Sequence, residues 1–268
     1  MRAWVPLSFI ALSFVALAPS ARAEDLAADP APIGAVGLES AATRYGTSYE
    51  TVYQLNLKPS ATLHIDSLEL SAMLPLSASA TAPTYCCRTT LGNATVSVAH
   101  RGASGGLRFW SEASVSAPSS YWSDPHANSL AATAALTRDA GYYLPYTTTL
   151  RAKLGAELEL TRWLWLGASA GADYWLRHEQ ATNALVVPLD AFATLPFARA
   201  WSARLAFRTL ARAFDPLGPR ERFLHELSGG VAHEWSRSRL EASLYVPVDE
   251  SLRELEMLSL AVAYSRSF

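Results

Sequence analysis

Histidine–carboxylate pairs are the residues best suited to acid–base or metal chemistry, and three of the six histidines stand directly before a glutamate. These pairs are His178 with Glu179, His225 with Glu226 and His233 with Glu234. A zinc-hydrolase helix that begins in this way needs a second histidine four residues after the first. Threonine, glycine and arginine occupy those three positions. The pattern therefore predicts no metal site, and no other motif predicts a cofactor.

A series of arginines, Arg204, Arg208 and Arg212, offers a different chemistry. Spacing of four places the three side chains on one face of a strand, and it suits one face of a helix as well. A row of guanidinium groups would attract anionic solutes, as charged rings do in pores. Alternatively, each arginine pairs with a glutamate on a neighbouring strand, and we favour this pairing.

Strands are the elements that the sequence provides to position such charges. Residues 149–161 alternate without a break between apolar and other residues, and Arg151, Lys153, Glu157 and Glu159 share the second row. Period two predicts a strand. At about 3.3 Å per residue this strand is roughly 40 Å long, which suits a tilted membrane crossing. Residues 68–76, 164–174 and 239–248 alternate in the same way.

The first residues have the order of a cleavable secretory signal. Arg2 precedes an apolar run over residues 5–18, and Pro19 and the small-residue triplet Ala21, Arg22 and Ala23 follow it. The run is shorter than the ~18 to 20 residues of a spanning helix. We therefore interpret residues 1–23 as a signal peptide and 24–32 as a short N-terminal segment.

The remaining chain, residues 33–268, reads as one domain because no Pro-, Gly- or Ser-rich linker divides it. The full chain has a net charge of −2, and without residues 1–23, which contain Arg2 and Arg22, 20 basic and 24 acidic residues give −4; neither value indicates nucleic-acid binding. Hydrophobic residues make up 50% of the chain, yet no later apolar stretch is long enough for a spanning helix. The apolar content must therefore lie in short strands.

Short and long connectors alternate between these strands along the chain. Short connectors are expected near residues 101–106, 161–162, 197–200 and 236–238. Long connectors are expected near residues 77–92, 117–145, 177–183, 214–221 and 249–253. Counting strands back from the C-terminus, with a weaker one over 33–43, gives about twelve, an even number as in bacterial outer-membrane barrels. A register change near residues 57–66 would reduce the number to ten.

The final strand carries the most specific pattern. Leu258, Leu260, Val262, Tyr264 and Phe268 share one face, and small or polar residues occupy the other. This resembles the C-terminal signal of bacterial outer-membrane β-barrel proteins, in which a terminal aromatic residue is read by the barrel-assembly machinery. Arg266 departs from that signal, which usually has an apolar residue there. A fainter similarity of residues 91–118 is to transporter-like outer-membrane proteins.

The resemblance implies an all-β, antiparallel up-and-down transmembrane barrel. It implies export across the inner membrane and insertion into the outer membrane of a Gram-negative envelope. Tyr264 and Phe268 would form the assembly signal, and the partners would be outer-membrane lipid and the barrel-assembly machinery.

Aromatic residues support a barrel whose short connectors lie at one end and whose long connectors lie at the other. Four tryptophans beside the short connectors would form an interfacial belt, and a second group flanks a long connector. The first group is Trp163, Trp165, Trp201 and Trp235. The second group is Tyr121, Trp122, Tyr142, Tyr143 and Tyr146.

Charged rows must face the lumen of such a barrel, because strands cross hydrocarbon only as a closed sheet with an apolar outer face. The expected lining residues are Arg108, Glu112, Arg151, Lys153, Glu157, Glu159, Asp173, Arg204, Arg208, Arg212, Glu226 and Glu234. The same rows include Asp190, Arg239 and Glu241. A lumen filled by paired side chains would be closed, whereas a wet lumen would pass solutes, and both readings remain open.

Residues 123–140 break the strand rhythm. Ser123 or Asp124 can cap a helix, Pro125 suits its first position, and an alanine-rich stretch follows. We predict a short helix here. It either enters the barrel mouth as a constriction or lies over the rim.

The adjacent Cys86 and Cys87 fall in one of the long connectors. Their Cα atoms are about 3.8 Å apart across a trans peptide, below the usual disulfide range. An exported chain meets oxidising conditions, so we expect a strained disulfide between them rather than two free thiols.

Three functions follow in order of preference. The first is a passive, porin-like channel or transporter-like barrel for an unidentified small solute. The second is a closed structural or adhesive barrel that acts through its loops. The third is an outer-membrane lipid hydrolase around His225, although no Gly-x-Ser-x-Gly elbow is present. A serine within hydrogen-bond reach of His225 or His178 would favour the hydrolase.

Overall fold

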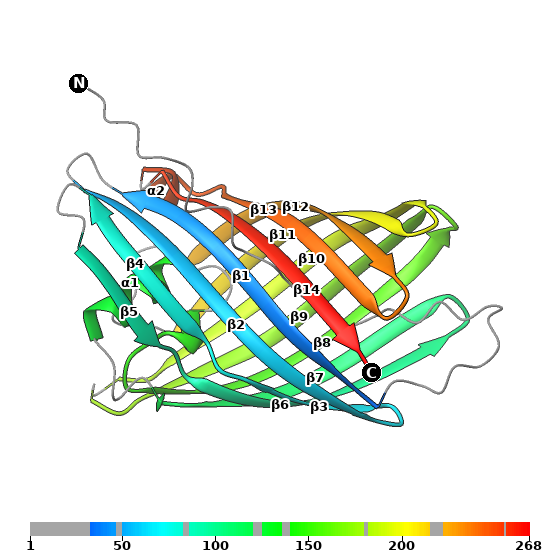
Figure 1. Cartoon of the computed structure of the whole chain (residues 1–268), viewed down its shortest axis with the longest axis horizontal. Helices are drawn as coiled ribbons and strands as arrows, with labels where there is room; N and C mark the ends of the chain where they lie inside the picture. The colour runs from blue at the N-terminus through cyan, green and yellow to red at the C-terminus, as the bar shows by residue number, and fades with distance from the viewer. Residues whose placement is uncertain are drawn as a thin grey trace.

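The computed structural model describes residues 33–46, 50–82, 86–119, 125–135, 140–179, 182–214, 222–254 and 256–268. The predicted signal peptide (residues 1–23) and the segment 24–32 lie outside the described residues. Fourteen strands within these ranges form a single antiparallel sheet (Figure 1). The sheet closes because β1 (Gly34–Gly46) pairs with both β2 (Thr51–Ile65) and β14 (Leu258–Ser267). The predicted up-and-down barrel is therefore confirmed.

Two crossings of the barrel wall are each made of two strands. β3 (Leu68–Met73) and β4 (Leu76–Ala82) both pair with β2, and a break at Leu74 and Pro75 separates them. Proline has no backbone N–H and so interrupts the ladder. β5 (Cys86–Leu91) pairs with β4, and β6 (Ala94–Ser104) pairs with β3. The strands therefore make twelve crossings, as predicted.

The other strands pair with their neighbours in chain order. They are β7 (Leu107–Ala117), β8 (Thr147–Thr161), β9 (Leu164–Arg177), β10 (Ala184–Ala198), β11 (Trp201–Phe214), β12 (Phe223–Trp235) and β13 (Ser238–Pro247). The arginine series lies in β11, so the helical alternative for these residues is wrong.

The two ends of the barrel differ in their connectors. Tight turns at residues 66–67, 105–106, 162–163, 199–200 and 236–237 lie at one end, here called the short-turn end. Gly105 and Gly106 both have positive φ, as a two-residue hairpin turn requires. The opposite end, the long-loop end, carries the longer connectors. The long connector expected over 77–92 is wrong, because β4 and β5 occupy most of it. The alternation of β4 uses serine, alanine and threonine, whose hydropathy differs too little to mark a strand.

The wall has an apolar outer face and a polar inner face. Leu154 is 67% exposed on the outside, whereas the neighbouring Arg151 turns inward with a side-chain exposure of 13%. Trp163, Trp201 and Trp235 are exposed on the outer face beside the tight turns, as expected of an interfacial belt. The faces therefore follow the period-two pattern of the sequence.

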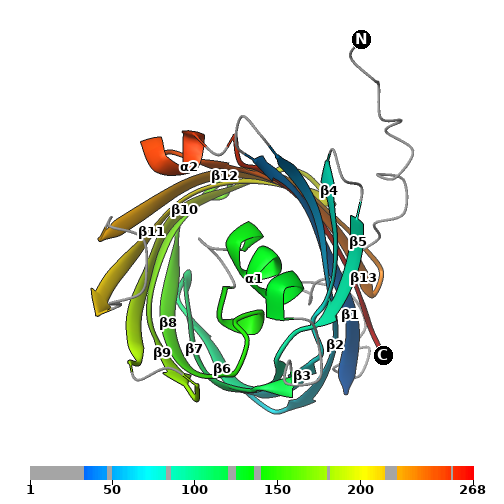
Figure 2. The same cartoon turned by 90° about the vertical axis from the view of Figure 1, so that its left-hand side faces the viewer.

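The helices lie at the long-loop end. Figure 2 shows α1 (Pro125–Ala134) inside the ring of strands, where η3 (Ala140–Tyr142) joins it. The short α2 (Glu250–Glu254) lies at the rim. Neither α1 nor α2 is long and apolar enough to cross a bilayer. The helix predicted within 123–140 is confirmed, and it enters the barrel rather than covering the rim.

Candidate functional site

The lumen at the long-loop end is filled by the described parts of the connector between β7 and β8. We call α1, η3 and residues 143–144 the plug. Its alanines and Tyr143 are almost fully buried, and Ala131 and Tyr143 have no exposed surface. Wall residues Trp175, Val186 and Leu210 turn inward at this level and pack in the same apolar cluster as the plug. Small alanine side chains fit the helix into the restricted width of a barrel.

Side-chain hydrogen bonds fix the plug to the wall. The Tyr45 hydroxyl donates to the carbonyl oxygen of Leu130 at 3.0 Å. The Thr90 hydroxyl donates to Oδ1 of Asn128 at 2.6 Å. Asn128 is fully buried, so this bond satisfies a polar group that would otherwise be costly to bury.

Asn93 is the main attachment point on the wall. It lies at the break between β5 and β6 and has no exposed surface. Its Nδ2 lies 3.1, 3.0 and 3.1 Å from the carbonyl oxygens of Gly141, Leu144 and Thr147. Its backbone N–H also donates to the carbonyl of Tyr142 at 2.6 Å. A single buried asparagine therefore holds η3 and the backbone that leads from it into β8.

The preceding glycine makes this approach possible. A Cβ at Gly92 would lie 2.7 Å from the Tyr142 carbonyl oxygen and 2.8 Å from Cβ of Pro75. A side chain at this position would therefore separate the plug from the wall.

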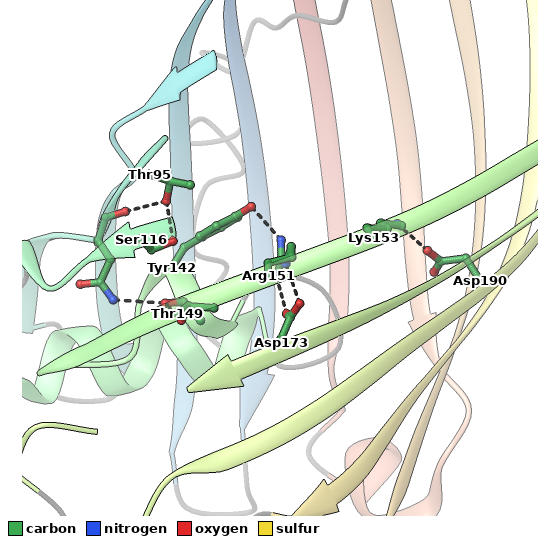
Figure 3. Close-up of polar contacts among 10 residues, drawn as sticks. Thr95, Ser116, Tyr142, Thr149, Arg151, Lys153, Asp173 and Asp190 are labelled. Carbon is green, nitrogen blue, oxygen red and sulfur yellow. Dashed lines mark hydrogen bonds and ion pairs between the residues drawn. The ribbon is translucent and has the colours of Figure 1, made fainter. Parts of the chain in front are cut away.

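A charged contact completes the attachment (Figure 3). Arg151 of β8 donates to both carboxylate oxygens of Asp173 on β9, at 2.8 and 2.6 Å. Its third nitrogen, Nη1, donates to the Tyr142 hydroxyl at 2.7 Å. The bidentate pair orients the guanidinium, so the remaining donor is directed at the plug.

Below the plug, charges cluster around Asp190 of β10. Lys153 contacts Oδ2 at 2.8 Å, as Figure 3 shows, and Ser169 donates to the same oxygen at 2.9 Å. Arg208 binds the other oxygen. Two cations thus share one carboxylate.

The short-turn end opens into a vestibule of about 930 Å³. Arg108 and Trp165 line it, with the Arg108 guanidinium carbon 3.9 Å from the centre of the indole ring. Trp165 therefore faces the lumen, and its predicted place in the interfacial belt is wrong. The parity of Trp165 with Gly167 and Asp173 in the alternating sequence would have placed it inside.

A smaller cavity of about 240 Å³ lies deeper in the lumen. Trp110, Phe192 and Arg204 line it together with the groups around Asp190. Arg204 and Glu241 line both the cavity and the vestibule, so the two spaces adjoin. The half of the lumen nearer the short-turn end is therefore a polar space that opens at that end.

The structure places the expected lining residues at several levels of the lumen. Arg151 and Asp173 lie at the plug, and Lys153, Arg204, Arg208 and Glu226 line the deep cavity. Arg108, Glu157, Glu159 and Glu234 line the vestibule. Arg212 and Glu226 are buried. Glu112 lies on the inner row of β7, opposite Lys153.

The residues that attach the plug were missed from the sequence. Asn93 and Thr90 are uncharged and carry no motif, although the Gly-Asn pair at 92–93 marks a break in the strand pattern. Tyr142 and Tyr143 belong to the plug, so their expected role in an outer aromatic group is wrong. Tyr121 and Trp122 of that group lie outside the described residues.

The geometry can be compared with known proteins. No protein-family model matches the chain, and no curated protein matches it by sequence. Among solved structures, it is similar to the COG4313 outer membrane channel from Pseudomonas putida F1. The two are 9% identical, the match covers 93% of this chain and all of that one, and the TM-score is 0.66. The chain has the fold of an outer-membrane β-barrel.

A second solved barrel is the translocator domain of the autotransporter NalP from Neisseria meningitidis. It is 8% identical, with 90% of each chain covered and a TM-score of 0.50. At these identities the likeness shows the fold of the outer-membrane barrel, and the function must be argued from the lumen.

The histidines do not assemble a hydrolase site in the described part of the chain. Nδ1 of His225 lies 2.8 Å from Oδ1 of Asp249, between the rings of Phe207 and Phe223. Nε2 of His178 forms a hydrogen bond with the Thr148 hydroxyl at 2.8 Å. No serine hydroxyl is within hydrogen-bond reach of either ring among the described residues.

The cysteine pair also differs from the expectation. Cys87 is an exposed free thiol, so the expected disulfide is not formed. The pair lies in β5 rather than in a loop.

Proposed function

We propose that this chain is a passive channel of the outer membrane, closed at its outer end by the plug. The observation that carries the proposal is the division of the lumen. The half at the short-turn end is a polar space that is open there, whereas the half at the long-loop end is filled by the plug, against which inward side chains of the wall pack. A loop held by side-chain hydrogen bonds can move without unfolding the barrel.

The orientation follows from the connectors. Tight turns face the periplasm and longer loops face the outside in bacterial barrels of this type. The vestibule then opens to the periplasm, and the plug separates it from the exterior. The named function of the Pseudomonas protein of the same fold, an outer membrane channel, agrees with this assignment.

A structural barrel would require a different interior. Wall side chains would pair across the whole lumen and leave no space for water. Here Arg208 pairs with Asp190 and Arg239 pairs with Glu234, but cavities of about 240 and 930 Å³ remain beside these pairs. The polar spaces therefore favour a solute path over a closed support.

A liposome-swelling assay tests the proposal. Mature protein (residues 24–268) is refolded into vesicles, and swelling is recorded in a small sugar such as arabinose. We expect slow swelling with the native barrel and faster swelling with Asn93→Ala, which loosens the plug. If both barrels migrate as folded, heat-modifiable species and neither allows swelling, the proposed channel is excluded.

A further inference from the structure

The deep cavity contains one cation that forms no ion pair or hydrogen bond with a carboxylate among the described residues. Lys153 and Arg208 both bind Asp190, and Glu241 accepts from Arg239 at 2.9 Å. Arg204 makes no such pair in the described ranges: its guanidinium carbon lies 3.8 Å from the centre of the Phe192 ring, and Glu157 and Glu241 interact with it only electrostatically, without an ion pair. Arg204 is nevertheless exposed to the lumen.

The contact with Phe192 leaves the hydrogen-bond donors of Arg204 available. A guanidinium over an aromatic ring uses the face of its planar group, whereas its five N–H bonds lie in the plane. The Phe192 ring in turn lies against Gly167, where a Cβ would be 2.3 Å from the ring. The ring thus supports a preorganised guanidinium that no protein oxygen occupies.

Aromatic side chains form the adjacent surface of the same cavity. The Trp110 ring lies 6.1 Å from that of Phe192, and it lies over Gly155, where a Cβ would be 2.2 Å from the indole. Tyr245 lines the cavity as well. The volume of about 240 Å³ is below the range of about 300 to 1,000 Å³ that is usual for drug-sized ligands.

We propose that the deep cavity is a binding site for a small aromatic monocarboxylate. The carboxylate accepts two hydrogen bonds from Arg204 in the fork geometry that guanidinium favours, and the ring of the ligand stacks against Trp110 and Tyr245. Because Arg204 is the only cation of this cavity without an ion pair to a carboxylate in the described part of the chain, the site suits a ligand with a single carboxylate. This inference deepens the proposed channel function, because it names the class of solute that the lumen retains.

The position of Arg204 makes the site testable without an open channel. Arg204 lines both the cavity and the vestibule, so a ligand reaches it from the short-turn end while the plug stays in place. Equilibrium binding in detergent and conductance across a bilayer therefore report on separate claims.

The experiment is isothermal titration of the refolded native barrel with benzoate, with acetate and benzyl alcohol as comparison ligands. We expect saturable benzoate binding and at least tenfold weaker binding of each comparison ligand, since each lacks either the ring or the charge. Arg204→Gln should weaken benzoate binding at least tenfold, because charge-assisted hydrogen bonds are lost. Arg204→Lys should retain part of it.

Arg44→Gln is the matched control, since Arg44 lies at the other end of the barrel and its side chain is 48% exposed. It should bind benzoate as the native barrel does. A folded native barrel without benzoate binding, or Arg204→Gln with unchanged binding, would overturn the site. Equal binding of acetate and benzoate would overturn its aromatic part. A barrel that binds benzoate but conducts no ions even after Asn93→Ala loosens the plug retains the site and refutes the channel.

Discussion

Cross-strand register explains which lumen charges find partners. Arg151 lies directly opposite Asp173, and Arg208 lies directly opposite Asp190, so each pair forms between adjacent strands. Lys153 lies opposite Gly171, which has no side chain to obstruct its path to Asp190 on the next strand. Arg204 lies opposite Thr194 and Gly230 and therefore has no carboxylate across from it.

The sequence could predict the row of each charge but only part of its pairing. Alternation placed Arg204 and Arg208 on one inner face, and the hypothesis that arginines pair with neighbouring carboxylates holds for Arg208. It fails for Arg204 because pairing depends on the register between strands, which alternation within one strand does not contain. Asn93 could not be singled out, since its partners are backbone carbonyls distant in sequence.

Asp190→Asn should destabilise the barrel. The side chain of Asp190 is 9% exposed, and its carboxylate binds both Lys153 and Arg208. The substitution leaves these two cations close together without a carboxylate between them. Loss of one member of a buried ion pair costs about 3 kcal/mol or more. Urea unfolding in lipid vesicles, followed by tryptophan fluorescence, measures this change.

Glu256→Gln is the control for that substitution, because the Arg44–Glu256 pair is exposed. Its removal should change the unfolding free energy by less than about 0.5 kcal/mol. Equal effects of the two substitutions would contradict a structural role for the Asp190 cluster.

At the scale of elements, strands with strong hydropathy contrast were predictable and weaker ones were not. β8 and β9 follow their alternating sequences closely. β4 and β5 were expected to be a loop, because small residues fill both faces. Pro125 and the following alanines predicted α1, but its location inside the barrel depends on packing against β1, β2, β4 and β5, which no local pattern encodes.

Asn93→Ala should loosen the plug without opening the barrel. It removes the two N–H donors of Nδ2, which lie within reach of three carbonyl oxygens, and a buried N–H bond is worth about 1 to 1.5 kcal/mol. A loss of about 2 to 3 kcal/mol raises the population of the detached plug about 30- to 150-fold. Hydrogen exchange of α1 amides, measured by mass spectrometry, should accelerate by that factor.

Thr133→Ala serves as the comparison, because Thr133 is in α1 and makes only an exposed bond to the Ser129 carbonyl. Its exchange rates should stay near native. Unchanged exchange of α1 in Asn93→Ala would show that Asn93 does not hold the plug.

At the scale of the whole molecule, the barrel closes where the first strand, β1, pairs with the last strand, β14. The backbone of Phe268 bonds Ile33 and Gly34 at distances of 2.9 to 3.3 Å, and β1 pairs with β14 along its length. Closure was predictable, because strands with one apolar face can satisfy their backbone in hydrocarbon only without an edge. The twelve crossings were predictable as a count, although two of them are split.

Deletion of Phe268 should lower the yield of assembled barrel in a Gram-negative host. The residue is 59% exposed on the outer face, so its side chain contributes little to the interior and is free to be recognised. The heat-modifiable fraction in outer membranes measures assembly. Phe268→Trp retains the aromatic end and should assemble as the native chain does, and equal yields from the deletion and the native chain would refute an assembly signal.

Single-channel conductance in planar bilayers tests the plugged channel most directly. The native barrel is compared with a variant in which a short Gly/Ser linker replaces residues 120–144. We predict rare, small steps from the native barrel and frequent, larger steps from the variant, because the half of the lumen at the short-turn end is already open. A folded variant with the same conductance as the native barrel, or with none, would contradict the account.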